Sequence, residues 1–227
     1  MLRKIIDFSI LTLKKNSLNR ILQIQFIKNK RLNGKVLEFG TSKNSSKKFS
    51  NFAKNTENTE FYFADQNFKE GQLDEKHNRE DLEKSLSYPN ENFDNILVFN
   101  VLEHVYDFSN SINEIYRILK KNGKVIGSVP FFYRVHGAPN DYYRFTAEAI
   151  EKKLIDTGFK NVYVKQIGYG PFTICYVMIF DYLKKIPLLN NLILLISIII
   201  DKILQNFIKT KLSDQYPISI CFEGDKI

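Results

Sequence analysis

From Gly34 onward, short apolar runs alternate with segments of helical periodicity, and this alternation constrains the fold more than any other feature of the chain. Such a pattern is typical of α/β proteins, in which helices cover a mostly parallel sheet. The clearest run, FDNILVFNVL at 93–102, is rich in Ile, Leu, Val and Phe, as expected for a strand buried on both faces. We expect one α/β domain, because 227 residues are few for two full domains.

Strand patterns recur along this part of the chain, with helical patterns between most of them. Apolar runs predict strands at 35–40, 60–66, 124–132, 161–168 and 216–224, and 77–82 is compatible with another short strand. Helices are expected at 45–55 and 109–123, the second ending at Gly123. Thr146 is a candidate N-cap and Gly158 a candidate stop for a further helix.

The N-terminal segment, residues 1–33, reads as a basic amphipathic helical arm that precedes the domain at 34–227. The first 35 residues contain nine basic residues and one acidic residue, so they account for the whole formal charge of +8. A basic amphipathic helix can lie on an anionic membrane surface. A helix packed on the domain, with its charges in water, explains the pattern equally well. Nucleic acid is not the expected partner, because the charge is confined to a stretch rich in Ile and Leu.

A second unusual segment, residues 169–213, is strongly apolar and precedes the last predicted strand. We expect a helical insertion here. Its longest uncharged run, 186–200, has 15 residues, whereas a helix that spans a bilayer needs roughly 20. Buried helices and a hairpin that dips into one leaflet both fit this length.

Two cysteines, Cys175 and Cys221, lie far apart and form no metal-binding pattern. We therefore predict neither a disulfide nor a metal site, and we expect a reducing, cytoplasmic setting. The arm and the apolar insertion extend this expectation to peripheral contact with the inner membrane face.

Two strand ends carry residues suited to a ligand. Gly40 closes the first predicted strand and Asp65 follows the second, and open α/β sheets bind ligands at the carboxyl ends of their strands. A carboxylate in the place of Asp65 can accept hydrogen bonds from both hydroxyls of a ribose, although an ordinary turn residue is the simpler explanation for a single Asp. The fingerprint GxGxxG is absent, which disfavours a nicotinamide or flavin cofactor.

Several motifs then follow one another between 93 and 130: FD, an apolar strand, VLEHV, a helix with EIYRILK, and NGKVIGSVP. In this order the sequence resembles the class I S-adenosylmethionine-dependent methyltransferases. HGAPNDYYRFT, at 136–146, is similar to members associated with cell-surface polysaccharide and lipopolysaccharide gene sets. The resemblance implies an α/β, Rossmann-like class I fold with a mostly parallel seven-stranded sheet, helices on both faces, and S-adenosyl-L-methionine as cofactor.

The resemblance also assigns cofactor contacts to residues at the strand ends. Glu38 and Gly40 would border the methionine portion, and Asp65 would hold the ribose. Asp81 and Leu82 would flank the adenine, and Asn100 and Val101 would lie beside the transferred methyl. The next two residues, Glu103 and His104, are given a structural role.

One departure from the family concerns the loop after Gly40. The family usually has two further glycines at alternate positions, where this chain has Ser42 and Asn44. Because Asn tolerates left-handed backbone, the loop can still form. The departure supports an alternative function, a non-catalytic methyltransferase-like binding or scaffold protein at the membrane surface.

The stretch VPFFYRVHGAPNDYYRFT, at 129–146, offers the candidate catalytic residues. His136 is the best base because it titrates near neutrality, and Asp141 can orient it or act as base itself. Arg144, helped by Arg134, can hold an acceptor carboxylate or phosphate. Tyr143, with its neighbour Tyr142, can form a sugar-stacking wall. Alternatively, Asp141 pairs with Arg144 and the rings seal the loop.

The sequence thus predicts a methyltransferase that acts on a small-molecule or glycan-type acceptor. We expect O-methylation during surface polysaccharide biosynthesis. Alignment of nucleophile, methyl carbon and sulfur in a dry pocket supplies much of the catalysis, so no metal is demanded.

Overall fold

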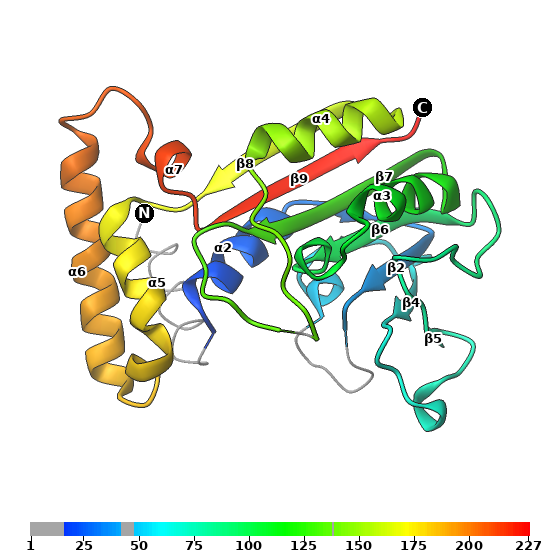
Figure 1. Ribbon diagram of the computed structural model, residues 1–227, viewed down its shortest axis with the longest axis horizontal. Helices are drawn as coiled ribbons and strands as arrows, with labels where there is room; N and C mark the ends of the chain where they lie inside the picture. The colour runs from blue at the N-terminus through cyan, green and yellow to red at the C-terminus, as the bar shows by residue number, and fades with distance from the viewer. Residues whose placement is uncertain (1–15, 42–47, 138) are drawn as a thin grey trace.

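A seven-stranded sheet organises the protein (Figure 1). A computed structural model describes residues 16–41, 48–137 and 139–227. The strand order is β5–β4–β2–β6–β7–β9–β8, and only β9 runs antiparallel to its neighbours. The strands are β2 (Lys35–Phe39), β4 (Glu60–Ala64), β5 (His77–Asn78), β6 (Phe93–Phe99), β7 (Leu119–Pro130), β8 (Lys160–Ile167) and β9 (Ser219–Asp225). The predicted mostly parallel seven-stranded sheet is confirmed.

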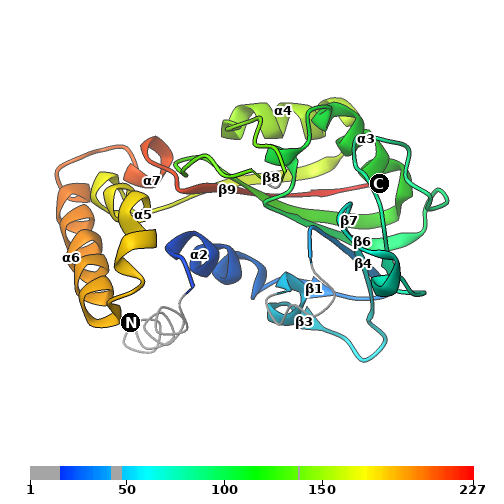
Figure 2. The same cartoon turned by 60° about the horizontal axis from the view of Figure 1, so that its bottom comes forward.

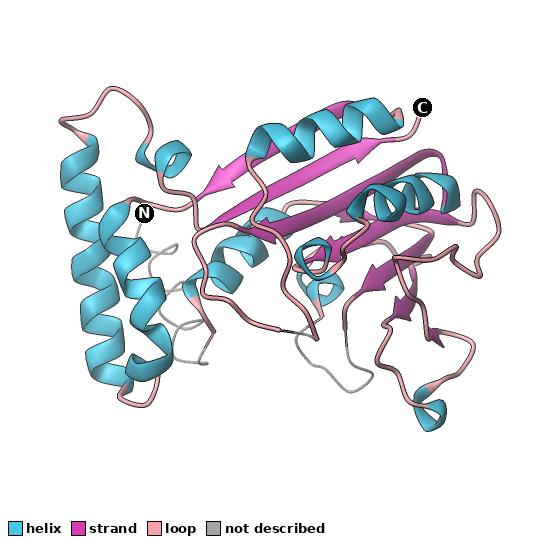
Figure 3. Ribbon diagram, viewed as in Figure 1, coloured by secondary structure: helices cyan, strands magenta, loops and turns pink. Residues whose placement is uncertain are grey.

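Helices cover both faces of the sheet (Figures 2 and 3). On one face, α3 (Phe108–Ile118) and α4 (Ala147–Thr157) bury apolar side chains such as Ile115 and Leu154. On the other face, α2 (Leu18–Ile27) packs Ile24 and Ile27 in one cluster with side chains of β2, β6 and β7. The sheet is therefore buried on both sides, which explains the continuous apolar run of β6.

The predicted caps of α4 are both present. The Thr146 side chain accepts a hydrogen bond from Ala149 N at 3.2 Å. Gly158 ends the helix with a left-handed φ of +116°, and its N–H donates to Ile155 O at 3.0 Å. Thr146 thus fixes where the preceding loop re-enters regular structure.

Three element predictions need correction. The helix expected at 109–123 ends at Ile118, because Leu119 is fully buried and already pairs with Phe93 of β6. Gly123 consequently lies inside β7. In the segment 45–55, the described part forms the short 3-10 helix η1 (Phe49–Phe52) and then β3 (Lys54–Asn55), which pairs with β1 (Arg31–Leu32). The strand proposed at 77–82 is only the two-residue β5.

The described part of the N-terminal arm is an integral layer of the fold. Gln23 of α2 has no exposed surface and donates to Asn100 Oδ1 at 2.7 Å and to Ser128 Oγ at 2.8 Å. The alternative of a helix packed on the domain therefore describes Leu18–Ile27. Residues 1–15 of the predicted arm lie outside the described residues.

The apolar segment 169–213 contains a helical hairpin beyond β8 and β9 (Figures 1 and 2). It comprises α5 (Pro171–Leu183) and α6 (Pro187–Gln205), followed by the short α7 (Leu212–Gln215). Among the described helices, α6 is long and apolar enough to cross a membrane, and only 28% of its most apolar window is buried. The length predicted from the uncharged run, 15 residues, was too short. The helix has 19 residues, because it continues through Asp201 and Lys202 to Gln205.

Several polar side chains of α6 are buried together with Leu194 and Ile198, whereas most of its exposed side chains are apolar. Asp201 is fully buried and accepts hydrogen bonds from Phe172 N and Thr173 N, at 3.0 and 2.8 Å, at the start of α5. Asn190 is buried against the Tyr176 hydroxyl. In contrast, the exposed large apolar residues of α6 are Leu188, Leu189, Leu192, Leu195, Ile196, Ile199 and Ile203. The hairpin thus presents a continuous apolar surface to its surroundings.

Candidate cofactor cleft and acceptor loop

An open cleft with about 670 Å³ of empty space lies at the carboxyl ends of β2, β4 and β6. Six of the seven predicted cofactor residues line it: Gly40, Asp65, Asp81, Leu82, Asn100 and Val101. These residues come from four separate segments, and only the parallel order of the strands brings them together.

Gly40 is required by both backbone conformation and space. Its φ is +72°, and a Cβ at this position would lie 2.5 Å from Val101 Cγ2. Its N–H donates to Ala64 O at 2.9 Å, so the turn after β2 is tied to the end of β4. The backbone can therefore approach a ligand closely at this point.

Two acids border the other side of the cleft. Asp65 Oδ1 accepts from Asn67 N at 2.7 Å, and Asp81 Oδ1 accepts from Glu83 N at 3.0 Å. Each carboxylate is thus oriented by its own turn while it faces the cleft. Asp65 is therefore both an ordinary turn residue and a residue that lines the cleft. Leu82 is buried beside Asp81 and supplies an apolar wall.

Asn100 is positioned by the helix on the opposite face of the sheet. Its φ is +54°, its N–H donates to Ser128 O at 2.8 Å, and its side-chain nitrogen donates to Gln23 Oε1 at 3.1 Å. The left-handed conformation turns the chain sharply out of β6 and sends Val101 across Gly40. Asn suits this position because it adopts left-handed backbone more readily than most residues.

Glu38 is the predicted cofactor residue that does not line the cleft. Its side chain is buried beneath η1, where it accepts from Phe49 N at 2.7 Å and Ser50 N at 3.1 Å. Burial raises the pKa of this carboxyl above its ordinary value. Glu38 thus holds the segment that follows the loop at 42–47, and Ser42 and Asn44 in that loop lie outside the described residues.

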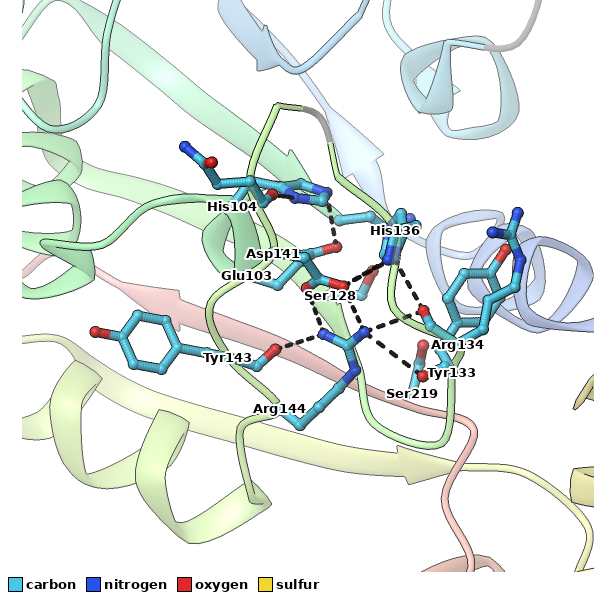
Figure 4. A network of polar contacts seen from close by, with 12 residues as sticks. Glu103, His104, Ser128, Tyr133, Arg134, His136, Asp141, Tyr143, Arg144 and Ser219 are labelled. Carbon is cyan, nitrogen blue, oxygen red and sulfur yellow. Dashed lines mark hydrogen bonds and ion pairs between the residues drawn. The ribbon is translucent and has the colours of Figure 1, made fainter.

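The predicted catalytic loop, at 131–137 and 139–146, is organised by one ion pair (Figure 4). Arg144 donates to both carboxylate oxygens of Asp141, at 2.5 and 2.7 Å. Asp141 also accepts from His136 N at 2.8 Å. Hydrogen bonds from Arg144 hold the pKa of Asp141 well below its usual range, so Asp141 is a poor proton acceptor. Further bonds from Arg144 to the carbonyls of Tyr143 and Arg134 occupy its guanidinium within the loop.

The tyrosines contribute a wall beside this pair. Tyr143 donates its hydroxyl to Tyr106 O at 2.9 Å, and its ring contacts Phe108 and Phe145. Tyr142 is exposed and packs edge-on against Tyr106. Arg134 lies apart from these rings and pairs with Asp181 of α5 at 2.6 Å, which joins the loop to the hairpin.

His136 lies next to two residues that the sequence analysis treated as structural. Its ring stacks edge-on against His104, with centroids 4.9 Å apart, and His104 lines the cofactor cleft. Glu103, the preceding residue of the turn η3 (Leu102–His104), is fully buried, and burial raises its pKa to about 8. Burial likewise lowers the pKa of His136. The cluster therefore joins the predicted catalytic loop to the cleft.

The sequence offered a signal for this cluster. Glu103 and His104 follow the most apolar strand of the chain after three residues, at the sheet edge where ligands bind. Their association with His136 could not be predicted, because it depends on how the loop folds back over the strand end.

Comparisons with known proteins agree with this geometry. The model of a family described as a methyltransferase domain matches residues 42–127. No curated protein matches the sequence significantly. Among solved structures, phosphoethanolamine N-methyltransferase 2 of Haemonchus contortus, in complex with phosphomonomethylethanolamine and S-adenosylhomocysteine, is similar with a TM-score of 0.56 and 13% identity. The match covers 92% of this chain and 52% of that one, so the chain spans about half of the nematode enzyme.

Two prokaryotic structures match over nearly their full length. A SAM-dependent methyltransferase of Archaeoglobus fulgidus has a TM-score of 0.57 at 13% identity, with 92% of this chain and 93% of that chain covered. A SAM-dependent methyltransferase of Thermotoga maritima, described as a possible histamine N-methyltransferase, has a TM-score of 0.57 at 15% identity, with 99% and 97% covered. At 13% and 15% identity, these similarities show a shared fold only. Together with the family match over 42–127, they support a Rossmann-like α/β fold of the class I methyltransferase type, as the sequence predicted.

Proposed function

We propose that this protein transfers a methyl group from S-adenosylmethionine to a hydroxyl oxygen of a small-molecule or glycan-type acceptor in surface polysaccharide biosynthesis. The main support for this proposal is that one cleft is lined by Gly40, Asp65, Asp81 and Asn100. The Haemonchus contortus enzyme, solved with S-adenosylhomocysteine and with S-adenosyl-L-methionine, supports the choice of donor. Its complex with phosphomonomethylethanolamine supports a small-molecule acceptor.

The residues of the cleft fit this donor. The close approach permitted at Gly40 suits the amino-acid portion, and the carboxylate of Asp65 can accept from ribose hydroxyls. Asp81 and Leu82 offer an acceptor and an apolar surface for a purine. When bound, the donor presents a methyl carbon on a positively charged sulfur, so a bond from the acceptor oxygen forms as the carbon–sulfur bond breaks and sulfur keeps the electron pair.

The loop residues would act on the acceptor. We assign to His136 the activation of the acceptor hydroxyl, because its ring lies beside His104 at the edge of the cleft. The Asp141–Arg144 pair positions His136 through the bond from His136 N. Tyr143 and Tyr142 form the side wall. The expected result is that His136→Ala abolishes turnover while cofactor binding survives, and full activity of this variant would remove His136 from the reaction.

Calorimetry with S-adenosylmethionine and S-adenosylhomocysteine tests the donor. We expect one site per chain, with the product bound at least as tightly as the donor. No detectable binding of either molecule would favour the alternative of a non-catalytic scaffold. Transfer of a labelled methyl group to nucleotide sugars and lipid-linked sugars, against amines of similar size, tests the acceptor. Labelling of the amines alone would contradict O-methylation.

We also propose that the α5–α6 hairpin holds the enzyme at the inner membrane face. Seven large apolar side chains of α6 are exposed while its polar residues Asn190, Ser197 and Asp201 are buried, which is unlike the pattern expected for a helix in water. Lys184 and Lys185 lie at one end of the hairpin, and Lys209 and Lys211 follow the other. Such flanking cations favour anionic lipid surfaces. Lipid-linked acceptors would then be within reach of the loop joined to α5 through Arg134 and Asp181.

Cosedimentation with vesicles tests this contact. We expect the protein to bind phosphatidylglycerol-containing vesicles more strongly than pure phosphatidylcholine vesicles. Combining Leu188→Ser, Leu192→Ser and Leu195→Ser should reduce binding strongly, since all three side chains are exposed. Deleting residues 1–15 in a parallel protein measures the contribution of the arm. Equal binding by the wild type and the triple variant would contradict the proposal.

A further inference from the structure

Glu103, His104 and His136 form a cluster of metal-ligand type at the acceptor side of the cleft. Each offers one ligand atom, and the three atoms lie within 4.8 Å of one another. Figure 4 shows these side chains converging from the turn after β6 and from the catalytic loop. The sequence predicts no metal site, and the proposed methyl transfer does not require one, so a metal bound here would be an additional feature of the protein.

The carboxyl group of Glu103 is buried without a hydrogen-bond partner. Its side chain has no exposed surface, and neither carboxylate oxygen has a hydrogen-bond partner among the described residues. Its ionic contact among the described residues is with His104 Nε2, 3.7 Å from Oε1. The neighbouring Arg144 is occupied with Asp141. A buried carboxylate without partners is costly, and a cation bound between it and the two rings would satisfy it.

Both histidines have Nδ1 near a backbone carbonyl, which leaves Nε2 available as a metal ligand. His104 Nδ1 lies 2.5 Å from Asn140 O, and a carbonyl can only accept, so Nδ1 carries a proton; in the neutral ring the lone pair is then on Nε2. His136 Nδ1 lies 3.2 Å from Arg134 O, which favours the same tautomer. Histidines that bind metals usually donate their second N–H to a carbonyl or carboxylate in this way.

We propose that Glu103, His104 and His136 bind a divalent first-row transition metal ion through one carboxylate oxygen and two Nε2 atoms. Two imidazoles favour such ions over Mg²⁺ or Ca²⁺, which prefer oxygen ligands. Metal bonds of about 2.1 Å place the ligand atoms of one ion roughly 3–4 Å apart. The present separations therefore need only a small contraction, which the partly exposed His136 ring can provide.

Three protein ligands leave a coordination position for a small molecule. His104 also lines the cleft, so this position would face the acceptor. An ion there would lower the pKa of a coordinated acceptor hydroxyl, so that its proton passes to water and the oxygen attacks the methyl carbon. His136 would then act as a ligand of the ion and not as the base. This role rests on the proposed function, whereas ion binding itself does not.

Calorimetry and elemental analysis of the full chain without a histidine tag test the site. Cys175→Ser should be the background, because this exposed thiol is a competing ligand. We expect one Zn²⁺ or Co²⁺ per chain, and Co²⁺ should give visible absorption bands. Glu103→Gln and His136→Ala should each weaken Zn²⁺ binding at least about 10-fold. Mg²⁺ should not compete at equal concentration.

The third histidine of the chain provides a matched control. His77 contacts Asp74 at 2.8 Å on β5 and is outside the cluster, so His77→Ala should bind Zn²⁺ like the parent. If Glu103→Gln fails to fold, His136→Ala still tests the metal site. We expect this variant to fold, because the His136 side chain is 26% exposed. No Zn²⁺ binding by the folded parent, or equal binding by all variants, would overturn the metal site. Binding of S-adenosylmethionine should be measured in the same proteins. A protein that binds S-adenosylmethionine but not Zn²⁺ contradicts the metal site alone, whereas a protein that does not bind S-adenosylmethionine contradicts the proposed function.

Discussion

The side chain of Val101 occupies the space that any side chain at position 40 would need. A Cβ on Gly40 would lie 2.5 Å from Val101 Cγ2, and Gly40 has a φ of +72°. Two strand ends, those of β2 and β6, thus meet at the floor of the cofactor cleft. The sequence marks Gly40 as the residue that closes the first strand, and the structure shows that Val101 is the side chain that excludes a Cβ at this position.

Gly40→Ala should therefore impair the cleft. The left-handed conformation alone costs a residue with a Cβ about 1–2 kcal/mol, and relief of the contact with Val101 must shift the turn. We expect S-adenosylhomocysteine affinity to fall at least about 10-fold by calorimetry. Gly71→Ala is the control, because a Cβ there would meet no described atom within 4 Å. Equal affinities for the two variants would contradict the role of the turn.

Gln23→Ala should weaken both the fold and the cleft. Gln23 is fully buried and bonds to Asn100 and Ser128, so truncation leaves these polar groups without a partner. We expect the free energy of unfolding to fall by about 2–3 kcal/mol, with weaker cofactor binding through displacement of Asn100. Gln25→Ala, on the exposed face of the same helix, should change neither quantity. A normal unfolding free energy for Gln23→Ala would show that α2 is not an essential layer.

The sequence predicted the sheet because its signals are local. Apolar runs define β2, β4, β6 and β9, and caps at Thr146 and Gly158 define α4. Where tertiary packing competes with local pattern, the prediction was wrong. Leu119 continues the apolar face of α3 in sequence, but it is buried as the first residue of β7 and paired with Phe93.

The site residues also fall into those that the sequence could place and those that depend on tertiary packing. Asp65 could be placed from the strand order alone, because parallel strands end at one edge, whereas the family resemblance was needed to assign Asn100 to the site. The inward position of Glu38 could not be predicted, since it depends on the segment at Phe49 and Ser50 returning over β2. The same holds for His136 and His104, which lie 32 residues apart in the sequence and meet only through the folded loop.

Asp141→Asn should destabilise the protein through loss of its ion pair with Arg144. The Asp141 side chain is 3% exposed and binds both terminal nitrogens of Arg144. Removing one partner of such a buried pair leaves the other charge poorly compensated, so we expect a loss of about 2–4 kcal/mol in urea unfolding. Asp181→Asn, whose carboxylate is 34% exposed in its pairs with Arg134 and Lys184, should cost about 1 kcal/mol or less. Similar losses for both would show that burial does not distinguish the two pairs.

Glu114→Gln should reduce stability at neutral pH and lose its effect in acid. Glu114 is 12% exposed, bonds to Arg117, and accepts from Leu86 N at 2.7 Å. The bonds from Arg117 lower the pKa of Glu114 below its ordinary 4.5. Because the folded protein therefore binds this proton less tightly than the unfolded chain, the stabilisation is complete above about pH 4.5 and declines as pH falls through the folded pKa.

Urea unfolding from pH 7 to pH 3 measures this effect. The wild type should exceed Glu114→Gln by about 1–2 kcal/mol at pH 7, and the difference should shrink steadily below about pH 4.5. Glu151→Gln, on the exposed face of α4, should match the wild type throughout the range. A difference between the wild type and Glu114→Gln that stayed constant with pH would mean that the contribution of Glu114 comes from packing and neutral hydrogen bonds, because only the ionised carboxylate interacts with the charge of Arg117.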